Sequence, residues 1–234
     1  MKVLEGKSYG SIGHLPGSRR GPADKGVNDG QHRIVCVKSR DKRDRVIVQE
    51  KLDGSNVGVV KIGGKVVAIG RAGFSAESSP HEQHRMFARY VDDRRDMFAA
   101  MLREGDRVCG EWLAMAHGTV YDLPHEPFVA FDLFRDGARL PFDHFSALMR
   151  SHGVTMPKLL SDGPPMSIEA ADAALGEFGH HGALEMAEGC VWRVERDGKV
   201  DYLAKFVRAG KVDGKYFAET HGRDVWNTWR NWRP

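Results

Sequence analysis

The sequence predicts an α+β fold in which antiparallel sheet dominates. Short β-branched runs bounded by glycine turns alternate with a few segments of helical periodicity, and there is no internal repeat or low-complexity tract. At 234 residues and 41% hydrophobic composition, the chain is long enough to bury a core. We therefore expect a single folded domain of hairpins with helices around them.

Two strands joined by a pair of glycines form the clearest predicted hairpin. The segments 56–62 and 65–71 are rich in valine and isoleucine, and the two glycines between them are typical of a tight two-residue turn. Counting along the antiparallel ladder from that turn places Asn56 opposite Arg71. Arg71 is therefore expected within a few residues of Lys51 across the hairpin.

A second hairpin is predicted near the end of the chain. Strands are expected over 189–195 and 200–207, joined by a four-residue turn. This register sets Cys190 opposite Lys205 and makes Glu188 and Lys205 diagonal neighbours on one face, roughly 7 Å apart at the backbone. Taken alone, the pair fits a surface ion pair worth about 1 kcal/mol or less.

The remaining regular elements follow from periodicity. The other predicted strands are the β-branched and aromatic runs 46–49, 107–111 and 128–134. Apolar residues at helical spacing predict helices over 81–103, 142–152 and 168–178. The first of these is one long helix or two shorter ones, because a charged stretch interrupts it. Ser167 is a plausible N-cap for the last.

Both ends of the chain differ in composition from the middle. Residues 1–33 are rich in glycine, proline and arginine and predict an ordered loop or flexible arm of the same domain, which would itself extend over 34–210. Residues 211–234 form a basic extension. Its tryptophans recur every third residue, at Trp226, Trp229 and Trp232. This spacing favours one helical face packed on the core over stacking on nucleic-acid bases.

The composition narrows the classes of partner. Lys and Arg number 35 against 32 Asp and Glu, so the formal charge of +3 leaves nucleic-acid binding to local basic patches. Three cysteines without Cys-x-x-Cys spacing argue against a disulfide framework and a zinc knuckle. The sequence has no signal core and no apolar stretch of about 20 residues, which predicts a cytoplasmic protein without a membrane partner.

Four histidines lack the spacing of a zinc site: His81, His84, His180 and His181. They are expected to be solvated or to lie on helix surfaces.

The most specific local feature is the run Glu50-Lys51-Leu52-Asp53-Gly54, in which a lysine stands just before a tight turn. An amine must lose its proton to attack phosphorus, and this requires partial burial or nearby cations. Asp53 and Gly54 would let the backbone turn closely beside a bound nucleotide. Taken alone, the run fits an ordinary surface turn at least as well.

The run Lys51-x-Asp53-Gly54 resembles the first signature of the covalent nucleotidyltransferase superfamily, which comprises DNA ligases, RNA ligases and mRNA capping enzymes. Further matches follow in the family's order: Arg71, Glu111 within 108–112, Phe131 within 128–134, Glu188-Gly-Cys-Val191 and Leu203-Ala-Lys205-Phe. They extend over about two-thirds of the chain. The resemblance implies an antiparallel-sheet nucleotidyltransferase core, ATP-grasp-like with flanking helices, over 34–210.

The resemblance also implies a role for each matched residue. Lys51 would attack the α-phosphate of ATP, expel pyrophosphate and hold AMP through a phosphoramidate bond. Arg71 and Lys205, the other catalytic residues, would contact phosphate oxygens. Glu188 would hold a divalent cation, Mg²⁺ or alternatively Mn²⁺. The remaining nucleotide contacts would be Glu111 on the ribose, Phe131 on the base, Glu50 on the adenine amine, and Asn56.

Some of these assignments have plain alternatives. A carboxylate at Glu50 would favour adenine over guanine, but an exposed strand-end charge fits this position equally well. A core aromatic is a serious alternative for Phe131. Related RNA ligases carry two basic residues one position apart in the last motif, whereas here Arg208 follows Lys205 at a spacing of three. The position that Lys205 fills, and a substrate contact for Arg208, therefore stay open.

The resemblance implies an ATP-dependent RNA ligase that joins 3′-hydroxyl and 5′-phosphate ends through a lysyl-AMP and an adenylylated 5′ end. Only 29 residues follow Lys205, too few for the OB-fold domain of DNA ligases and capping enzymes, and a partner protein could supply the missing substrate binding. Arg19 and Arg20 are candidates for contacting the triphosphate or the 5′ end. The alternatives are a DNA ligase, a GTP-dependent capping-type enzyme, and a non-catalytic module that binds nucleotides or nucleic-acid ends.

Overall fold

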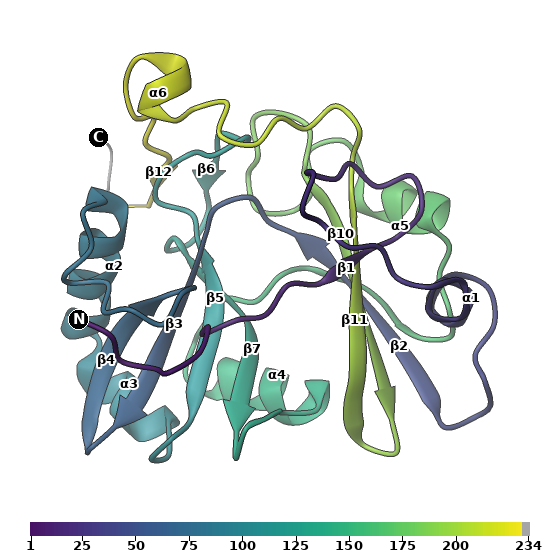
Figure 1. Cartoon of the computed structure of the whole chain (residues 1–234), viewed down its shortest axis with the longest axis horizontal. Coiled ribbons are helices and arrows are strands. Elements are labelled where there is room, and N and C mark those ends of the chain that lie inside the picture. Colours follow the sequence, from purple (N-terminus) through teal and green to yellow (C-terminus); the bar gives the residue numbers. More distant parts are fainter. Residues whose placement is uncertain (231–234) are drawn as a thin grey trace. The chain divides into compact units, whose positions relative to one another are not determined.

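The protein, described here over residues 1–230 by a computed structural model, divides into two units that share the chain in alternating segments. The first unit comprises residues 1–10, 54–115 and 126–156, and the second comprises 11–53, 116–125 and the chain from 157 onward. Each unit contains its own five-stranded sheet with helices (Figure 1). The predicted α+β class with predominantly antiparallel pairing is confirmed.

The sheet of the first unit has the strand order β4-β3-β5-β7-β8 and is antiparallel throughout. Its strands are β3 (Ser55–Ile62), β4 (Lys65–Gly70), β5 (Arg107–Trp112), β7 (Phe128–Arg135) and β8 (Ala138–Arg139). Its helices are α2 (Glu82–Asp93), α3 (Arg95–Met101) and α4 (Phe142–Ser151). The predicted segment 81–103 is therefore two helices, separated by Arg94, which adopts a non-helical conformation.

The glycine hairpin has the predicted register. Gly63 and Gly64 have φ values of 58° and 71°, which a tight two-residue turn requires at both positions. Ile62 pairs with Lys65, and the β3–β4 ladder ends where Val57 pairs with Gly70. Extending this register by one position sets Asn56 opposite Arg71, as the sequence predicts.

The sheet of the second unit has the order β1-β11-β10-β2-β9. Its strands are β1 (Gly13–His14), β2 (Asp44–Lys51), β9 (Leu159–Gly163), β10 (Gly189–Arg196) and β11 (Lys199–Val207). The helices are α1 (Asp29–Cys36), α5 (Ile168–Leu175) and α6 (Ala218–His221), and a two-stranded parallel sheet joins β6 (Asp122–Leu123) to β12 (Thr228–Trp229). Only β1 pairs in parallel within the larger sheet of the described residues.

The second predicted hairpin is correct in its strands, but its predicted register holds only next to the turn, where Glu195 pairs with Val200. The turn has two residues at its centre, Asp197 and Gly198, with φ values of 52° and 71°. A β-bulge places one extra residue, Asp201, in β11 opposite the step from Val194 to Glu195 in β10, and this shifts every pair farther from the turn by one position. Cys190 therefore pairs with Phe206 and not with Lys205.

The same shift moves Glu188 off the predicted ladder. Glu188 precedes β10, and its carbonyl accepts the backbone N–H of Arg208 at 3.0 Å. The predicted diagonal pairing of Glu188 with Lys205 was therefore wrong in register.

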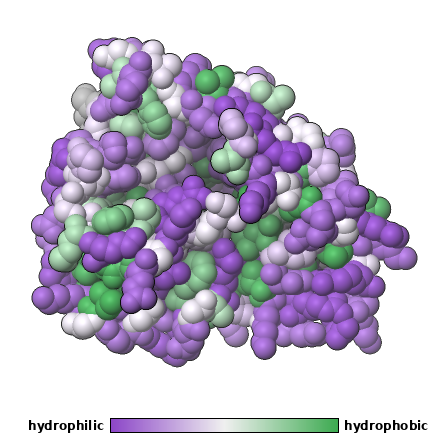
Figure 2. Space-filling view, in the orientation of Figure 1, coloured by the Kyte–Doolittle hydropathy of each residue, from purple (hydrophilic) through white to green (hydrophobic). Residues whose placement is uncertain are grey.

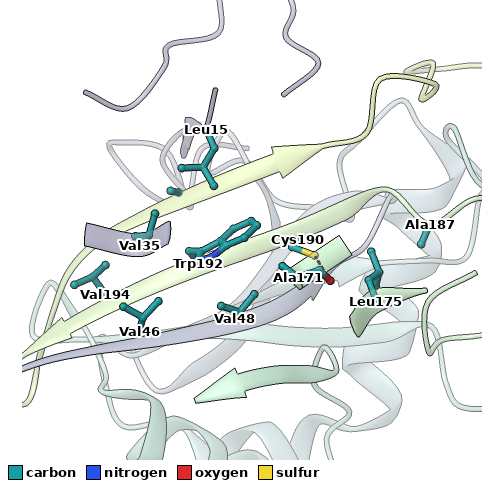
Figure 3. Packing of buried hydrophobic residues seen from close by; sticks show 11 residues of the cluster. Leu15, Val35, Val46, Val48, Ala171, Leu175, Ala187, Cys190, Trp192 and Val194 are labelled. Atoms are coloured by element: carbon teal, nitrogen blue, oxygen red, sulfur yellow. Dashed lines mark hydrogen bonds between the residues drawn. The ribbon is translucent and has the colours of Figure 1, made fainter. Parts of the chain in front are cut away.

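Alternation along the strands divides the side chains of this sheet between two faces. One face carries the buried cluster drawn in Figure 3, which packs against α1 and α5. Its strand members are Val46, Val48, Cys190, Trp192, Val194 and Ala204, and Leu15 joins it directly after β1. The opposite face therefore carries the intervening residues, including His14, Lys51 and Lys205. The apolar core and the candidate functional residues thus lie on opposite faces of this sheet.

The ends of the strands in this unit are highly charged. Asp44 at the start of β2 accepts hydrogen bonds from Arg40 and Arg196, and Arg196 also bonds Asp41. Figure 2 shows the corresponding surface as predominantly hydrophilic at lower right. These charged side chains satisfy one another as ion pairs near the surface.

The segment 1–33, predicted as a loop or arm, contains part of a helix. Asn28 caps α1 by accepting the backbone N–H of Gln31 at 2.8 Å, while the Gln31 side chain accepts the N–H of Asn28 at 3.2 Å. This capping box and the buried Val35 stabilise α1. The pattern Asn-x-x-Gln was present in the sequence and could have revealed the helix.

Up to residue 230, the helix predicted for the tryptophan spacing does not form. Gly222, with φ 84°, ends the short α6, and Trp229 lies in β12, which pairs with β6. Asn227, fully buried, accepts the N–H of Tyr121 at 2.8 Å, so this segment is tied to the chain by strand pairing and not by a helical face. Trp232 lies outside the described residues. Within residues 1–230, no helix combines the length and the apolar character that a bilayer crossing requires.

Candidate functional site

The second unit places Lys51 beside a buried carboxylate. Lys51 is the last residue of β2, and its Nζ lies 2.6 Å from Oε2 of Glu188. The two side chains are 21% and 8% exposed. Burial raises the pKa of Glu188 to about 7, although the Lys51 ammonium acts in the opposite direction. The predicted nucleophile and the predicted metal ligand are therefore in direct contact.

The glycine after Glu188 makes this contact possible. Gly189 has φ 153°, and a Cβ at this position would collide with the carbonyl oxygen of Phe206. The chain can therefore approach β11 closely as it enters β10. This explains physically why glutamate is followed by glycine in the motif.

The aspartate of the Lys-x-Asp-Gly run anchors a neighbouring loop. Asp53 Oδ2 accepts the N–H of Gly118 at 3.0 Å and the hydroxyl of Thr119 at 3.2 Å. The backbone N–H of Asp53 donates to the hydroxyl oxygen of Tyr121 at 3.2 Å. A Cβ at Gly118 would collide with Asp53 and with the carbonyl of Val212. Asp53 thus fixes the segment that follows Lys51 against residues 116–121.

Lys211 supports the same loop from the other side. Its buried ammonium donates to the carbonyls of Gly118 at 2.9 Å and Met186 at 3.0 Å, and also to Thr119. It lies 3.9 Å from Asp53 Oδ2, and burial lowers the pKa of Lys211. Sequence reasoning placed this residue in a basic tail, whereas the structure gives it an internal role.

Glu50 lies on the face of the sheet opposite Lys51. It is 2% exposed, and its two oxygens accept the backbone N–H of His180 at 3.2 and 3.0 Å. Gly179 provides the necessary space, because a Cβ there would collide with the carboxylate. Burial raises the pKa of Glu50 to about 7. The alternative of an exposed strand-end charge was therefore wrong, while contact with adenine stays a prediction.

Replacing Glu50 by glutamine should change how stability depends on pH. The folded protein holds Glu50 with a pKa above its unfolded value, so its contribution to stability is present at low pH and is lost as pH rises from about 4.5 to 7. Glutamine does not titrate, so the stability of Glu50→Gln relative to wild type should increase across this window, by at most about 3 kcal/mol. Urea unfolding of both proteins at several pH values measures this; a difference independent of pH would contradict it.

His181 is buried and not solvated as expected. Its Nδ1 lies 2.7 Å from Nε2 of His125, and its Nε2 accepts the backbone N–H of Lys158 at 3.2 Å. Burial lowers the pKa of His181 to about 3, so the ring is neutral. The chain turns inward at Gly182, where φ is 77° and a Cβ would collide with Asp122. The neighbouring His180 is exposed, as predicted.

Arg208 is held by the end of α5. Its guanidinium bonds the Asp172 carboxylate at 2.6 Å and donates to the carbonyls of Gly176 at 2.7 Å and Glu177 at 3.0 Å. A cation at the C-terminus of a helix satisfies its unpaired carbonyls and interacts favourably with its dipole. The geometry therefore gives Arg208 a structural role at the end of α5.

Arg208→Ala should lower the free energy of unfolding by about 2–3 kcal/mol, because buried carbonyls lose their donor. Arg223→Ala is the matched control, since Arg223 is exposed in the C-terminal segment and its removal should change stability by less than about 0.5 kcal/mol. Chemical denaturation of the two variants measures both effects. Equal stability of the two would show that the contacts of Arg208 contribute nothing.

The first unit carries the other predicted nucleotide contacts. Asn56 on β3 pairs with Glu111 on β5, and Oε1 of Glu111 accepts the N–H of Gly54 at 3.1 Å. Oδ1 of Asn56 is buried and makes no hydrogen bond within the described residues. A Cβ at Gly54 would approach the carbonyl of Trp112 to 2.6 Å, so glycine is required there.

Arg71 and Phe131 lie in different parts of this unit. Arg71 is exposed directly after β4. Phe131 on β7 is half-buried and makes an edge-to-face contact with Tyr9, with the ring centroids 4.9 Å apart. This contact accounts for Phe131 as part of the packing, so its stacking on a base stays a prediction.

Comparison with known families now identifies the chain. The model of the RNA ligase family matches residues 44–207. The chain belongs to the RNA ligase family. The matched part includes every motif residue from Lys51 to Lys205, which confirms the nucleotidyltransferase resemblance. Comparison with curated proteins gives no significant match.

Solved RNA ligase structures share the fold. A variant of the Naegleria gruberi RNA ligase with AMP and Mn has a TM-score of 0.56 at 15% identity, covering 88% of this chain and 59% of the other. The same ligase with PPi gives 0.54 at 16%, with 94% and 63% covered. An archaeal ATP-dependent RNA ligase gives 0.50 at 24%, with 70% and 43% covered. This RNA ligase domain thus spans about half the length of these structures.

Proposed function

We propose that the protein is an ATP-dependent RNA ligase that joins 3′-hydroxyl and 5′-phosphate ends through AMP held on Lys51. The observation that carries this proposal is the position of Lys51 at the end of β2, in contact with the buried Glu188. The RNA ligase family and the shared fold support it.

In the first step Lys51 Nζ forms a bond to the α-phosphorus of ATP, and the bond from that phosphorus to pyrophosphate breaks. The ammonium must lose a proton first, because the lone pair is the nucleophile. Its pairing with Glu188 at 2.6 Å favours the charged form. In the proposed reaction Lys51 therefore rests as an ammonium paired with Glu188, and the amine becomes reactive once Glu188 takes another partner.

Glu188 is the residue that would hold a divalent cation. Among residues 1–230, no three His, Cys, Asp or Glu side chains are grouped to hold a metal. A single carboxylate that acts together with substrate phosphates and water is nevertheless a usual mode of Mg²⁺ binding. Such a cation would supply positive charge to the phosphate oxygens of the nucleotide. Naegleria gruberi RNA ligase structures contain Mn with ATP or AMP, and we extend this to Mg²⁺ or Mn²⁺ here.

Several further residues would contact the nucleotide. Asn56 has a buried oxygen that makes no hydrogen bond within residues 1–230, which suits a donor on the ligand. Glu111 would accept a ribose hydroxyl, and Arg71 and Lys205 would neutralise phosphate charge. Stacking by Phe131 and selection of adenine by Glu50 complete the proposed set.

Labelling with ATP tests the proposal directly. Incubation with α-³²P-ATP and Mg²⁺ should transfer label to the protein through an acid-labile phosphoramidate, whereas GTP should not label it. A protein that binds ATP without forming the bond would instead be the non-catalytic module. Labelling by GTP in preference to ATP would indicate a capping-type enzyme.

Sealing assays identify the substrate. A nicked duplex with a 3′-terminal ribose at the junction should be sealed faster than one with deoxyribose if RNA is the substrate. Equal rates, or a preference for deoxyribose, would indicate a DNA ligase. A requirement for added cell extract would support the partner protein that we propose to supply further RNA binding.

A further inference from the structure

The short strand β1 brings a histidine next to the predicted phosphate-binding lysine. His14 pairs with Lys205 in the parallel β1–β11 ladder, and the following Leu15 enters the core cluster. His14 therefore points to the face that carries Lys51 and Lys205, and Figure 1 shows β1 crossing beside β11. Its side chain is 2% exposed.

Within residues 1–230, one ring nitrogen of His14 makes only a long contact to a carboxylate. Nδ1 lies 2.7 Å from the hydroxyl of Ser18, which in turn accepts the N–H of Val207 at 2.9 Å. Nε2 is buried without a hydrogen-bond partner in residues 1–230, although Oδ2 of Asp24 lies 3.3 Å away. The nearby carboxylate favours the tautomer that carries its proton on Nε2. Nε2–H therefore faces the Asp24 carboxylate at a distance longer than that of a good hydrogen bond, and a closer anionic oxygen could replace this contact.

Positive charge surrounds this donor. Burial and the charges of Lys205, Arg20 and Lys51 lower the pKa of His14, while Asp24 opposes them. Arg20 lies over Gly26, where a Cβ would approach its guanidinium to 2.8 Å. The absence of a side chain at Gly26 therefore gives the guanidinium room beside His14. A neutral donor flanked by cations suits an anionic oxygen.

The order of the strands indicates which anionic group would lie beside His14 and Arg20. Three strand steps, about 14 Å, separate Lys51 on β2 from His14 on β1, and Lys205 on β11 lies between them. In-line displacement requires the leaving group to lie opposite the attacking Nζ. His14 and Arg20 are thus on the side of Lys205 where the departing end of a triphosphate would extend.

We propose that His14 and Arg20, together with Lys205, bind the β- and γ-phosphates of ATP and hold pyrophosphate as it leaves. This inference rests on the proposed ligase function. Nε2–H of His14 donates to a phosphate oxygen, and the Arg20 guanidinium neutralises its charge. Asp24, 41% exposed, orients Nε2–H in the nucleotide-free protein and turns to water when the phosphate arrives. The 5′-phosphate of RNA is also an anion that these residues could bind, and the experiments below distinguish it from the phosphates of ATP.

Three reactions of purified enzyme distinguish the two phosphates: adenylylation by ATP, release of ATP from enzyme-AMP by pyrophosphate, and transfer of AMP to a 5′-phosphorylated strand. His14→Phe and Arg20→Gln should slow the first two by about 10²-fold, the effect of losing one charge-stabilising donor. Transfer to the strand should stay within about twofold. Loss of strand transfer with an intact pyrophosphate reaction would assign the site to the 5′-phosphate and overturn the proposal.

Binding of pyrophosphate alone, measured by calorimetry, separates this inference from the ligase function. Both variants should bind it at least about tenfold more weakly than wild type. Arg33→Gln, an exposed arginine of α1, is the control and should bind as wild type does. Arg20 is itself exposed, so Arg20→Gln should fold even if His14→Phe does not. Unchanged pyrophosphate binding in Arg20→Gln would overturn the subsite, whether or not ATP labels the protein.

Discussion

Lys51→Ala is expected to abolish labelling of the protein by α-³²P-ATP, with a loss of more than about 10⁴-fold, because loss of a covalent nucleophile costs at least this much. No other lysine can substitute unless its nitrogen reaches the same phosphorus in line. The measurement is the label retained on the denatured protein after a timed incubation. Label that persists in this variant would place the nucleophile elsewhere.

A second variant separates chemistry from folding. Lys51→Ala leaves the buried Glu188 without its cation, which is destabilising. Lys51→Arg keeps a cation beside Glu188 but offers no amine that attacks phosphorus at neutral pH. It should therefore fold like wild type, as judged by circular dichroism, and still fail to become labelled. Both variants should retain sealing of a strand that already carries AMP, because Lys51 acts only while it holds the nucleotide.

Glu188→Gln is expected to reduce adenylylation by about 10²–10³-fold, since it removes the negative charge proposed to hold the divalent cation. Glutamine preserves the size of the side chain and can still accept a hydrogen bond from Lys51. The folded state should be at least as stable as wild type near pH 7, because burial raises the pKa of Glu188 and disfavours its charged form.

The dependence on Mg²⁺ provides the diagnostic measurement. Glu188→Gln should require a higher Mg²⁺ concentration for half-maximal labelling than wild type does, and Glu188→Asp should fall between them. A Glu188→Gln enzyme with the wild-type rate and the wild-type Mg²⁺ requirement would show that Glu188 only pairs with Lys51 and holds no cation.

Local turn chemistry made much of the fold predictable. Gly63 and Gly64 fixed the register of the first hairpin, because two positive φ values in succession permit few other turns. Ser167 was correctly expected to cap α5, where it accepts the N–H of Ala170 at 3.2 Å. The contact between Lys51 and Glu188 was implied only by the family's order of motifs.

Features that depend on tertiary packing were not predictable in the same way. The bulge at Asp201 has no clear local signal, yet it shifts the register on which the Glu188 geometry was counted. Burial of Glu50 and His181 depends on Gly179 and Gly182, whose close contacts lie far away in the sequence. The tryptophan spacing was misleading because strand pairing of Trp229 determined the local structure.

Glu50 and Lys51 are consecutive residues on opposite faces of β2, so a slip of this strand by a single position would exchange a carboxylate for the amine on the phosphate side. Such a slip would also bring a lysine into the apolar cluster around Trp192, which strongly disfavours it. Burial of the apolar side chains of β2 therefore selects the correct register of this strand. A one-codon deletion within 46–49 should consequently eliminate the nucleophile from its working position even though Lys51 itself remains encoded.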